Sequence, residues 1–232
     1  MPRPPVILGA YAAVSVVHVL GRLSEVTWLT TVTKPLLMPL LAAFLISAST
    51  RPLTRMVRVV LVALASSWLG DVLLEAWRLT DVDALFLAGL GAFLVAQVLY
   101  IVAFAPLVRS SDPPRPPLWA LGYVLYGAVL VGFMAPDLGE FLLPVALYAV
   151  AICTMGIVAS GVNRYTLVGA ALFVLSDTLI ALGEFTEVLS WSDAQHDAAV
   201  MATYTLAQGL LVVGVVVAQQ GIWRRAPEPV AS

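Results

Sequence analysis

The sequence predicts an all-α integral membrane protein that crosses the bilayer many times. The chain has 232 residues, of which 61% are hydrophobic and 11% are charged, whereas an ordinary soluble domain is about 25% charged. Its mean hydropathy is +0.97. The 12 basic and 14 acidic residues are too few to cover a soluble globule of this size with polar groups. We therefore expect a polytopic membrane protein rather than a soluble enzyme or a disordered chain.

Charge and cysteine content exclude further classes. A net charge of −2 lacks the basic surplus of a nucleic-acid-binding protein, so we expect no nucleic-acid partner. The single cysteine, Cys153, leaves no internal disulfide and no cysteine-cluster metal site. The two histidines are too few for a three-histidine zinc site, and the sequence has no glycine-rich phosphate loop. We expect neither a metal nor a cofactor.

Eight apolar runs are long enough to span a membrane as helices. A helix needs about 20 residues to cross a hydrocarbon core of roughly 30 Å, and the runs lack the alternating pattern of barrel strands. We expect one eight-helix transmembrane domain over residues 1–232. The expected spans are about 6–22, 33–50, 57–77, 84–108, 118–135, 140–160, 164–184 and 199–222.

Turn residues and charges separate these runs. The breaks include Arg51-Pro52, the segment 78–83, the proline-rich segment 112–117 and Pro136-Asp137. The last break, 192–197, places His196 in a loop.

The basic residues predict the orientation. If the N-terminus is cytoplasmic, nine basic residues fall on the cytoplasmic side and three on the outer side. Cytoplasmic loops of membrane proteins carry such an excess of Lys and Arg. The inside set is Arg3, Arg51, Arg55, Arg58, Arg109, Arg115, Arg164, Arg224 and Arg225, and the outside set is Arg22, Lys34 and Arg78. We expect a multi-pass protein of the cell membrane with both termini in the cytoplasm.

Two aspartates inside the expected spans carry the strongest functional signal. Asp71 lies 13 residues after Arg58, and Asp177 lies 13 residues after Arg164, so both are about 20 Å from the cytoplasmic boundary. Two buried carboxyl groups that meet favour one protonated acid beside one ionised base. The alternative is a structural role, in which each aspartate bonds a neighbouring helix and holds the bundle together.

Other polar side chains fall in the same outer half of the bilayer. Lys34 fits either snorkelling to the interface or binding of a lipid phosphate. Glu75, one turn beyond the first aspartate, is expected to pair with Arg78 at i+3. We expect Glu184 at the interface, and we expect His18 to hydrogen-bond a neighbouring helix.

Five motifs occur in order along the spans. They are Lys34-Pro35, Gly70-Asp71, the stripe Phe86-x-x-Gly89-x-x-x-Phe93-x-x-Ala96-Gln97-x-x-Tyr100, Leu172-Phe173-x-x-Ser176-Asp177, and Tyr204-x-x-x-Gln208. From spacing alone, the stripe is a packing face on which Gly89 allows close approach. Together the motifs resemble the YhhN-type lysoplasmalogenase family over roughly residues 10–220. Many members of that family carry His where this chain has Gln97.

The resemblance implies a reaction and a set of site residues. It implies hydrolysis of the vinyl ether bond of lysoplasmalogens, which are alkenyl lysophospholipids, to a fatty aldehyde and a glycerophospho-alcohol. Asp71 and Asp177 are then the catalytic pair, and the partners are the lysophospholipid substrate and membrane lipids. The expected substrate-binding residues are Lys34, Glu75, Phe93, Gln97, Tyr100, Ser176, Tyr204 and Gln208. The alternative function is a proton-coupled transporter of a small molecule or lipid that uses the same aspartates as a relay.

Overall fold

The structure, a computed structural model, describes residues 3–80, 82–109 and 118–224, with the backbone alone at 109, 118 and 221–224. Arg115 and Arg225, which contributed to the predicted orientation, lie outside these ranges. Over the described ranges the chain forms helices and no strands, so the all-α prediction is confirmed. The elements are α1 Pro4–Leu23, α2 Thr27–Ala48, α3 Arg55–Thr80, α4 Asp83–Arg109, α5 Leu118–Leu138, the short 3-10 helix η1 Gly139–Phe141, α6 Leu142–Ser160, α7 Arg164–Phe185 and α8 Asp193–Arg224.

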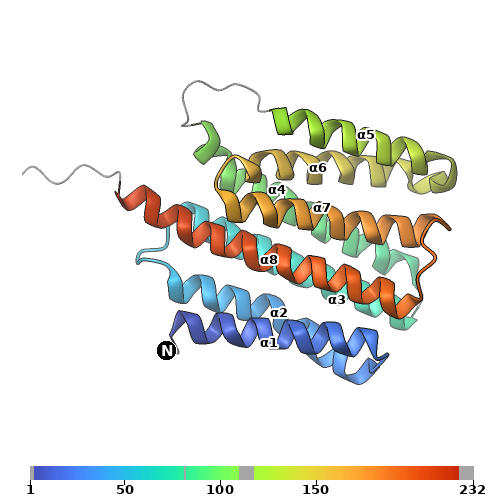
Figure 1. Ribbon diagram of the computed structural model, residues 1–232, viewed down its shortest axis with the longest axis horizontal. Helices are drawn as coiled ribbons and strands as arrows, with labels where there is room; N and C mark the ends of the chain where they lie inside the picture. The colour runs from blue at the N-terminus through green and yellow to red at the C-terminus, as the bar shows by residue number, and fades with distance from the viewer. Residues whose placement is uncertain (1–2, 81, 110–117, 225–232) are drawn as a thin grey trace, which may run out of the picture.

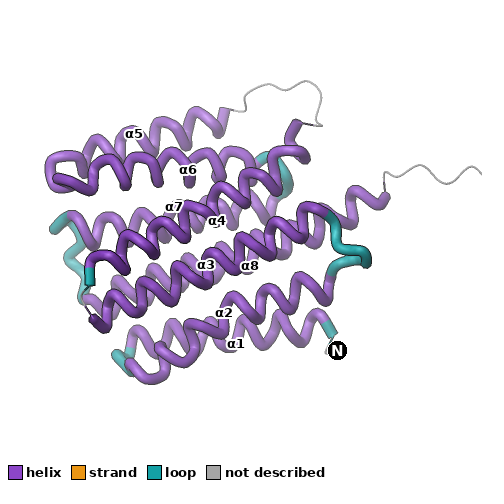
Figure 2. Tube along the Cα trace, turned by 180° about the vertical axis from the view of Figure 1, so that it is seen from behind, coloured by secondary structure: helices purple, strands orange, loops and turns teal. Residues whose placement is uncertain are grey.

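The helices form a bundle in which consecutive helices run antiparallel (Figure 1). Helices α5 and α6 form one edge and α1 and α2 the opposite edge, with α3, α4, α7 and α8 between them (Figures 1 and 2). One end of the bundle carries the α1–α2, α3–α4, α5–α6 and α7–α8 connections, and we call it the acidic end. The other carries the start of α1 and the α2–α3 and α6–α7 connections, and we call it the basic end.

Seven stretches of the described chain are long and apolar enough to cross a membrane. Six of them correspond to single helices. The seventh, Trp119–Ser160, has 42 residues and contains most of α5 together with η1 and α6. These stretches describe a multi-pass membrane protein.

Two predicted helix starts are wrong, and so is the predicted break at Pro136-Asp137. Helix α2 begins at Thr27, six residues before the predicted start, because threonine hydroxyls in its first turns bond backbone carbonyls of the same helix, as Thr33 does to Leu29 at 2.7 Å. Helix α5 continues through Pro136 to Leu138, and the turn comes at Gly139, whose φ is +49°. Helix α8 begins at Asp193 rather than near 199.

Helix α2 contains Pro35 and Pro39, which weaken its backbone hydrogen bonding. Proline has no N–H, so Pro39 leaves the carbonyl of Pro35 without its helical donor. The indole N–H of Trp68 on α3 donates to that carbonyl at 3.0 Å. A tryptophan within a predicted span therefore satisfies a backbone group that lipid cannot satisfy.

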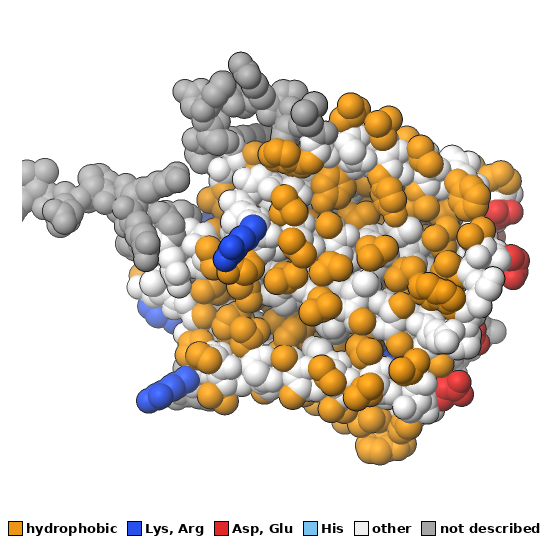
Figure 3. Space-filling view, in the orientation of Figure 1, with side chains coloured by type: hydrophobic (Ala, Val, Ile, Leu, Met, Phe, Trp, Pro, Cys, Tyr) orange, Lys and Arg blue, Asp and Glu red, His pale blue; other side chains and the backbone are white. Residues whose placement is uncertain are grey.

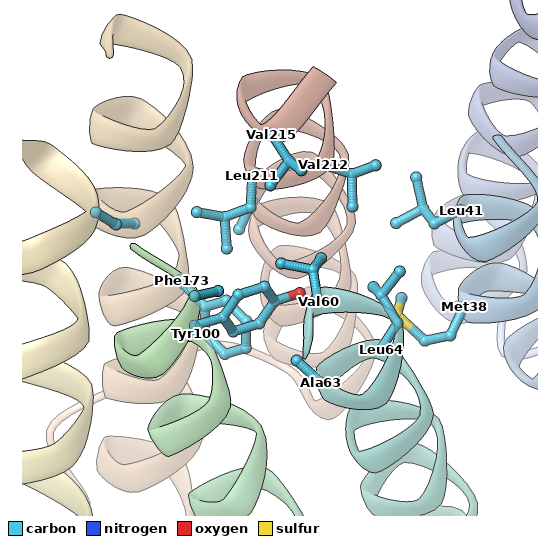
Figure 4. Close-up of a cluster of buried hydrophobic side chains, with 14 of the residues drawn as sticks. Met38, Leu41, Val60, Ala63, Leu64, Tyr100, Phe173, Leu211, Val212 and Val215 are labelled. Carbon is cyan, nitrogen blue, oxygen red and sulfur yellow. The ribbon is translucent and has the colours of Figure 1, made fainter. Parts of the chain in front are cut away.

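Most of the apolar core lies in the half of the bundle nearer the basic end, and Figure 4 shows part of it. It contains side chains of α2, α3, α4, α7 and α8, among them Met38, Leu64, Tyr100, Phe173 and Leu211. Helices α7 and α8 approach closely here because Gly169 has no side chain: a Cβ atom would lie 3.0 Å from the Ala207 carbonyl oxygen. Packing in this half leaves the opposite half free to hold polar groups.

The surface of the bundle is apolar along its sides and charged at its ends. Figure 3 shows hydrophobic side chains over the visible face, basic groups at one end and acidic groups at the other. Exposed apolar residues occur on every helix, as Val129 on α5 and Leu143 on α6 illustrate. An exposed apolar belt of this extent suits contact with lipid.

Candidate active site

A cavity of about 120 Å³ lies in the half of the bundle nearer the acidic end. Every α-helix except α5 contributes to its wall. Most of the lining is apolar, and its aromatic members include Trp77, Phe86 and Phe93. An apolar cavity with a few convergent polar groups is the usual form of a small-molecule site.

Both aspartates line this cavity. Asp71 on α3 is buried, with 3% of its surface exposed, and accepts a hydrogen bond from the Tyr204 hydroxyl at 2.9 Å. Asp177 on α7 is half-buried and accepts a hydrogen bond from the Tyr148 hydroxyl on α6. The bundle therefore brings together two acids 106 positions apart in sequence, each with its own tyrosine donor.

A hydrogen-bonded chain extends behind Asp71 into the core. Tyr100 donates to the Gln208 side-chain oxygen at 2.6 Å, and the Gln208 amide donates to Ser67 at 3.1 Å and toward Tyr204 at 3.5 Å. Tyr100 and Gln208 are fully buried and do not line the cavity. They hold Tyr204 in place rather than facing a ligand.

An ionic cluster of Arg22, Lys34, Glu75, Arg78 and Asp197 lies at the acidic end of the cavity. Glu75 binds Arg22 and also Lys34, at 3.3 Å, while Arg78 binds Asp197. The predicted Glu75–Arg78 pair is therefore wrong, because each residue finds a partner on another helix. Snorkelling of Lys34 is wrong as well, since its ammonium group is buried and paired.

The two histidines occupy different places. His196 lies within the first turn of α8, so the prediction of a loop is wrong; its ring bonds the Leu179 carbonyl oxygen at 2.8 Å and lines the cavity. His18 is buried and bonds the Thr33 hydroxyl at 2.8 Å, which confirms a contact between helices. Glu184 is exposed and lines the cavity.

The stripe on α4 is buried, as predicted for a packing face. Phe93 lines the cavity and meets the Tyr204 ring edge to face at 5.9 Å. A Cβ atom at Gly70 would lie 2.6 Å from the Phe93 ring, so this glycine makes room for the ring beside Asp71. Gln97 is fully buried away from the cavity, and its amide lies beside Tyr148 without a hydrogen bond of ordinary geometry.

The other predicted site residue, Ser176, lines the cavity and donates to the Val200 carbonyl at 3.1 Å, which ties α7 to α8. The sequence analysis missed Tyr148 and Asp197. Tyr148 belongs to no motif, and the only indication of a role was its hydroxyl group within an otherwise apolar span. No group of three metal-ligating side chains capable of holding an ion occurs among the described residues.

Comparison with known proteins places the chain in a family. The model of the YhhN family matches residues 29–215, a range that includes both aspartates and both tyrosines. The chain belongs to the YhhN family. This membership confirms the resemblance found in the sequence motifs.

Curated relatives of this YhhN protein carry lysoplasmalogenase names. A Mycobacterium bovis protein named lysoplasmalogenase is 34% identical over 147 residues, which is 60% of this chain and 54% of that protein. A Sus scrofa protein named lysoplasmalogenase TMEM86B is 33% identical over 156 residues, which is 66% of this chain and 61% of that protein. The chain thus matches little more than half the length of these relatives. No solved structure matches the chain.

Proposed function

We propose that this YhhN protein is a membrane hydrolase that cleaves the vinyl ether bond of alkenyl lysophospholipids. The observation that carries the proposal is the pair Asp71 and Asp177 in one cavity, each hydrogen-bonded to a tyrosine. Family membership and the lysoplasmalogenase names of its relatives support the same reaction.

The proposed chemistry needs one acid and one base. A protonated aspartate transfers its proton to the alkenyl carbon that carries the hydrocarbon chain, and the carbon bonded to oxygen becomes an oxocarbenium ion. The ionised aspartate stabilises this cation and accepts a proton from the water that adds to it. The resulting hemiacetal breaks its carbon–oxygen bond to give a fatty aldehyde and a glycerophospho-alcohol. Glycosidases use two carboxyl groups on a similar cation.

The proposed roles of the remaining residues follow from their positions. Tyr148 and Tyr204 orient the two carboxyl groups, and Phe93 with Gly70 shapes the wall beside Asp71. Lys34 lines the cavity, and we assign its ammonium group to the phosphate side of the substrate. A charged contact of this kind contributes about 1.5–3 kcal/mol.

We also propose eight crossings with both termini in the cytoplasm. The stretch Trp119–Ser160 would extend about 63 Å as one helix, twice the thickness of the hydrocarbon core, and it turns back at η1. Arg3, Arg51 and Arg55 are exposed at the basic end, while the basic residues of the acidic end are held in ion pairs. The site then lies in the outer half of the bilayer.

Labelling of single cysteines tests this orientation. In a Cys153→Ser background, a cysteine at the exposed Gln195 position is expected to react with a membrane-impermeant maleimide on intact cells. A cysteine at Arg51 is expected to react only after lysis. The reverse pattern would contradict the proposed topology.

Product analysis tests the reaction itself. Purified protein is incubated with alkenyl, alkyl and acyl lysophospholipids that share one head group and one chain length. We expect aldehyde from the alkenyl lipid alone, because an alkyl ether offers no carbon to protonate and an ester yields a fatty acid. A transporter would release no product from any of the three, and release of fatty acid from the acyl lipid would indicate an esterase.

A further inference from the structure

A second cavity of about 50 Å³ lies between α5, α6 and α7. It shares Val145, Tyr148, Asp177 and Ala181 with the main cavity. The Tyr148–Asp177 pair therefore forms part of the walls of both cavities. We call this second cavity the α5–α7 groove.

The α5–α7 groove is lined almost entirely by hydrocarbon, including Leu130, Val131, Met134, Ala149 and Ile152. Its hydroxyl groups are already bonded: Tyr126 and Thr178 bond each other at 2.8 Å, and Thr178 also donates to the Val174 carbonyl at 2.7 Å. Apart from the Tyr148–Asp177 pair at its junction with the main cavity, the groove offers a polar ligand no free group to bind. An alkyl chain can enter it without leaving any polar group unpaired.

The two cavities together form a gradient of polarity. The ionic cluster lies at the acidic end, the two aspartates lie further in, and the α5–α7 groove continues from Asp177 on the side of α5. A lysophospholipid has the same order of parts: a charged head group, the ether bond, and one hydrocarbon chain.

We propose that the α5–α7 groove holds the hydrocarbon chain of the substrate, which passes the Tyr148–Asp177 pair to reach it. The inference rests on the proposed function, because it takes the ether bond to lie in the main cavity. The alkenyl carbon that receives the proton is the one that carries the chain. Asp177, at the junction of the two cavities, then faces that carbon.

Filling the groove from each of its walls tests the proposal. Ala149→Phe on α6 and Val131→Phe on α5 place a ring in the groove, and the matched controls Val150→Phe and Val129→Phe place the same ring on the lipid-facing side, where those valines are 67% and 70% exposed. The measurement is the ratio of kcat/KM for a long-chain to a short-chain alkenyl lysophospholipid. We expect the ratio to fall roughly tenfold or more in both groove variants and to stay within about twofold in the controls. An unchanged ratio in both groove variants would overturn the proposal.

Photo-crosslinking separates this proposal from the proposed reaction. The probe is a non-hydrolysable alkyl lysophospholipid with a diazirine at the end of its chain, bound to the unmodified protein. We expect labelled peptides from α5 and α6, and labelling confined to α1, α2 or α8 would refute the assignment of the groove. Failure of the proposed function alone would appear as labelling of α5 and α6 without aldehyde release from the alkenyl lipid.

Discussion

The Tyr148 hydroxyl on α6 donates a hydrogen bond to the Asp177 carboxyl group on α7, at the wall shared by the main cavity and the α5–α7 groove. Tyr148→Phe removes this donor and keeps the ring. A hydrogen bond to a neutral group contributes about 0.5–1.5 kcal/mol, so we expect kcat for aldehyde release to fall roughly 2- to 10-fold.

Tyr123→Phe is the matched control for that variant. Its hydroxyl bonds Ser160 at 3.2 Å, and Tyr123 lines neither cavity. We expect its turnover to stay near that of the parent. If kcat fell equally in Tyr148→Phe and Tyr123→Phe, the Tyr148 hydroxyl would have no specific role in the reaction.

Gly70 and Phe93 predict a steric effect beside Asp71. In Gly70→Ala the new methyl group meets the Phe93 ring, which has to move. Overpacking of this kind costs about 1–3 kcal/mol, so we expect a lower unfolding midpoint in detergent and reduced turnover. Gly91→Ala, on the same helix as Phe93, has no atom within 4 Å of the new Cβ atom and should not lower the midpoint.

The ionic cluster predicts unequal effects for its members. Glu75→Gln leaves two cations, Arg22 and Lys34, without their shared carboxylate, and breaking a buried ion pair costs about 3–5 kcal/mol. Lys34→Met leaves Glu75 paired with Arg22 and should destabilise less. The free energy of unfolding in detergent measures both, with the exposed Glu187→Gln as control. A larger loss in Lys34→Met than in Glu75→Gln would contradict this account of the cluster.

The surroundings of the two aspartates predict which one is the acid. Asp177 lies at the junction of the main cavity and the α5–α7 groove, where the proposed chain site places the alkenyl carbon that receives the proton, whereas Asp71 lines the main cavity only. We therefore propose Asp177 as the general acid and Asp71 as the base. Formic acid should restore aldehyde release to Asp177→Ala increasingly as pH falls, and formate should restore it to Asp71→Ala increasingly as pH rises. The opposite pH dependences would exchange the two roles.

Much of the fold could be predicted from the sequence, because the length of each apolar run indicates a membrane-spanning helix. The helical type of the runs and the shared cavity of Asp71 and Asp177 follow from hydropathy and from a count of residues along two helices. Helix ends are less predictable, as the start of α2 shows. A polar residue at the edge of a span can bond its own helix instead of ending it, as the Thr30 hydroxyl does by donating to the Thr27 carbonyl.

Pairings between distant helices could not be predicted in the same way. Spacing along one helix indicated a Glu75–Arg78 pair, but Glu75 contacts Lys34, 41 positions away in sequence. The partner of Asp177 was missed for the same reason, since nothing in a single sequence places Tyr148 of α6 against α7. Such contacts depend on which helices pack together, and the spacing of residues along one helix does not determine this.

The most direct test of the central claim is aldehyde release from an alkenyl lysophospholipid by purified Asp71→Asn and Asp177→Asn variants. Asparagine keeps the shape of the side chain but can neither donate the proton nor hold the negative charge. Each variant is expected to retain its unfolding midpoint within a few degrees of the parent and to lose aldehyde release entirely. Parent-like turnover in both variants would contradict catalysis by this pair of carboxyl groups.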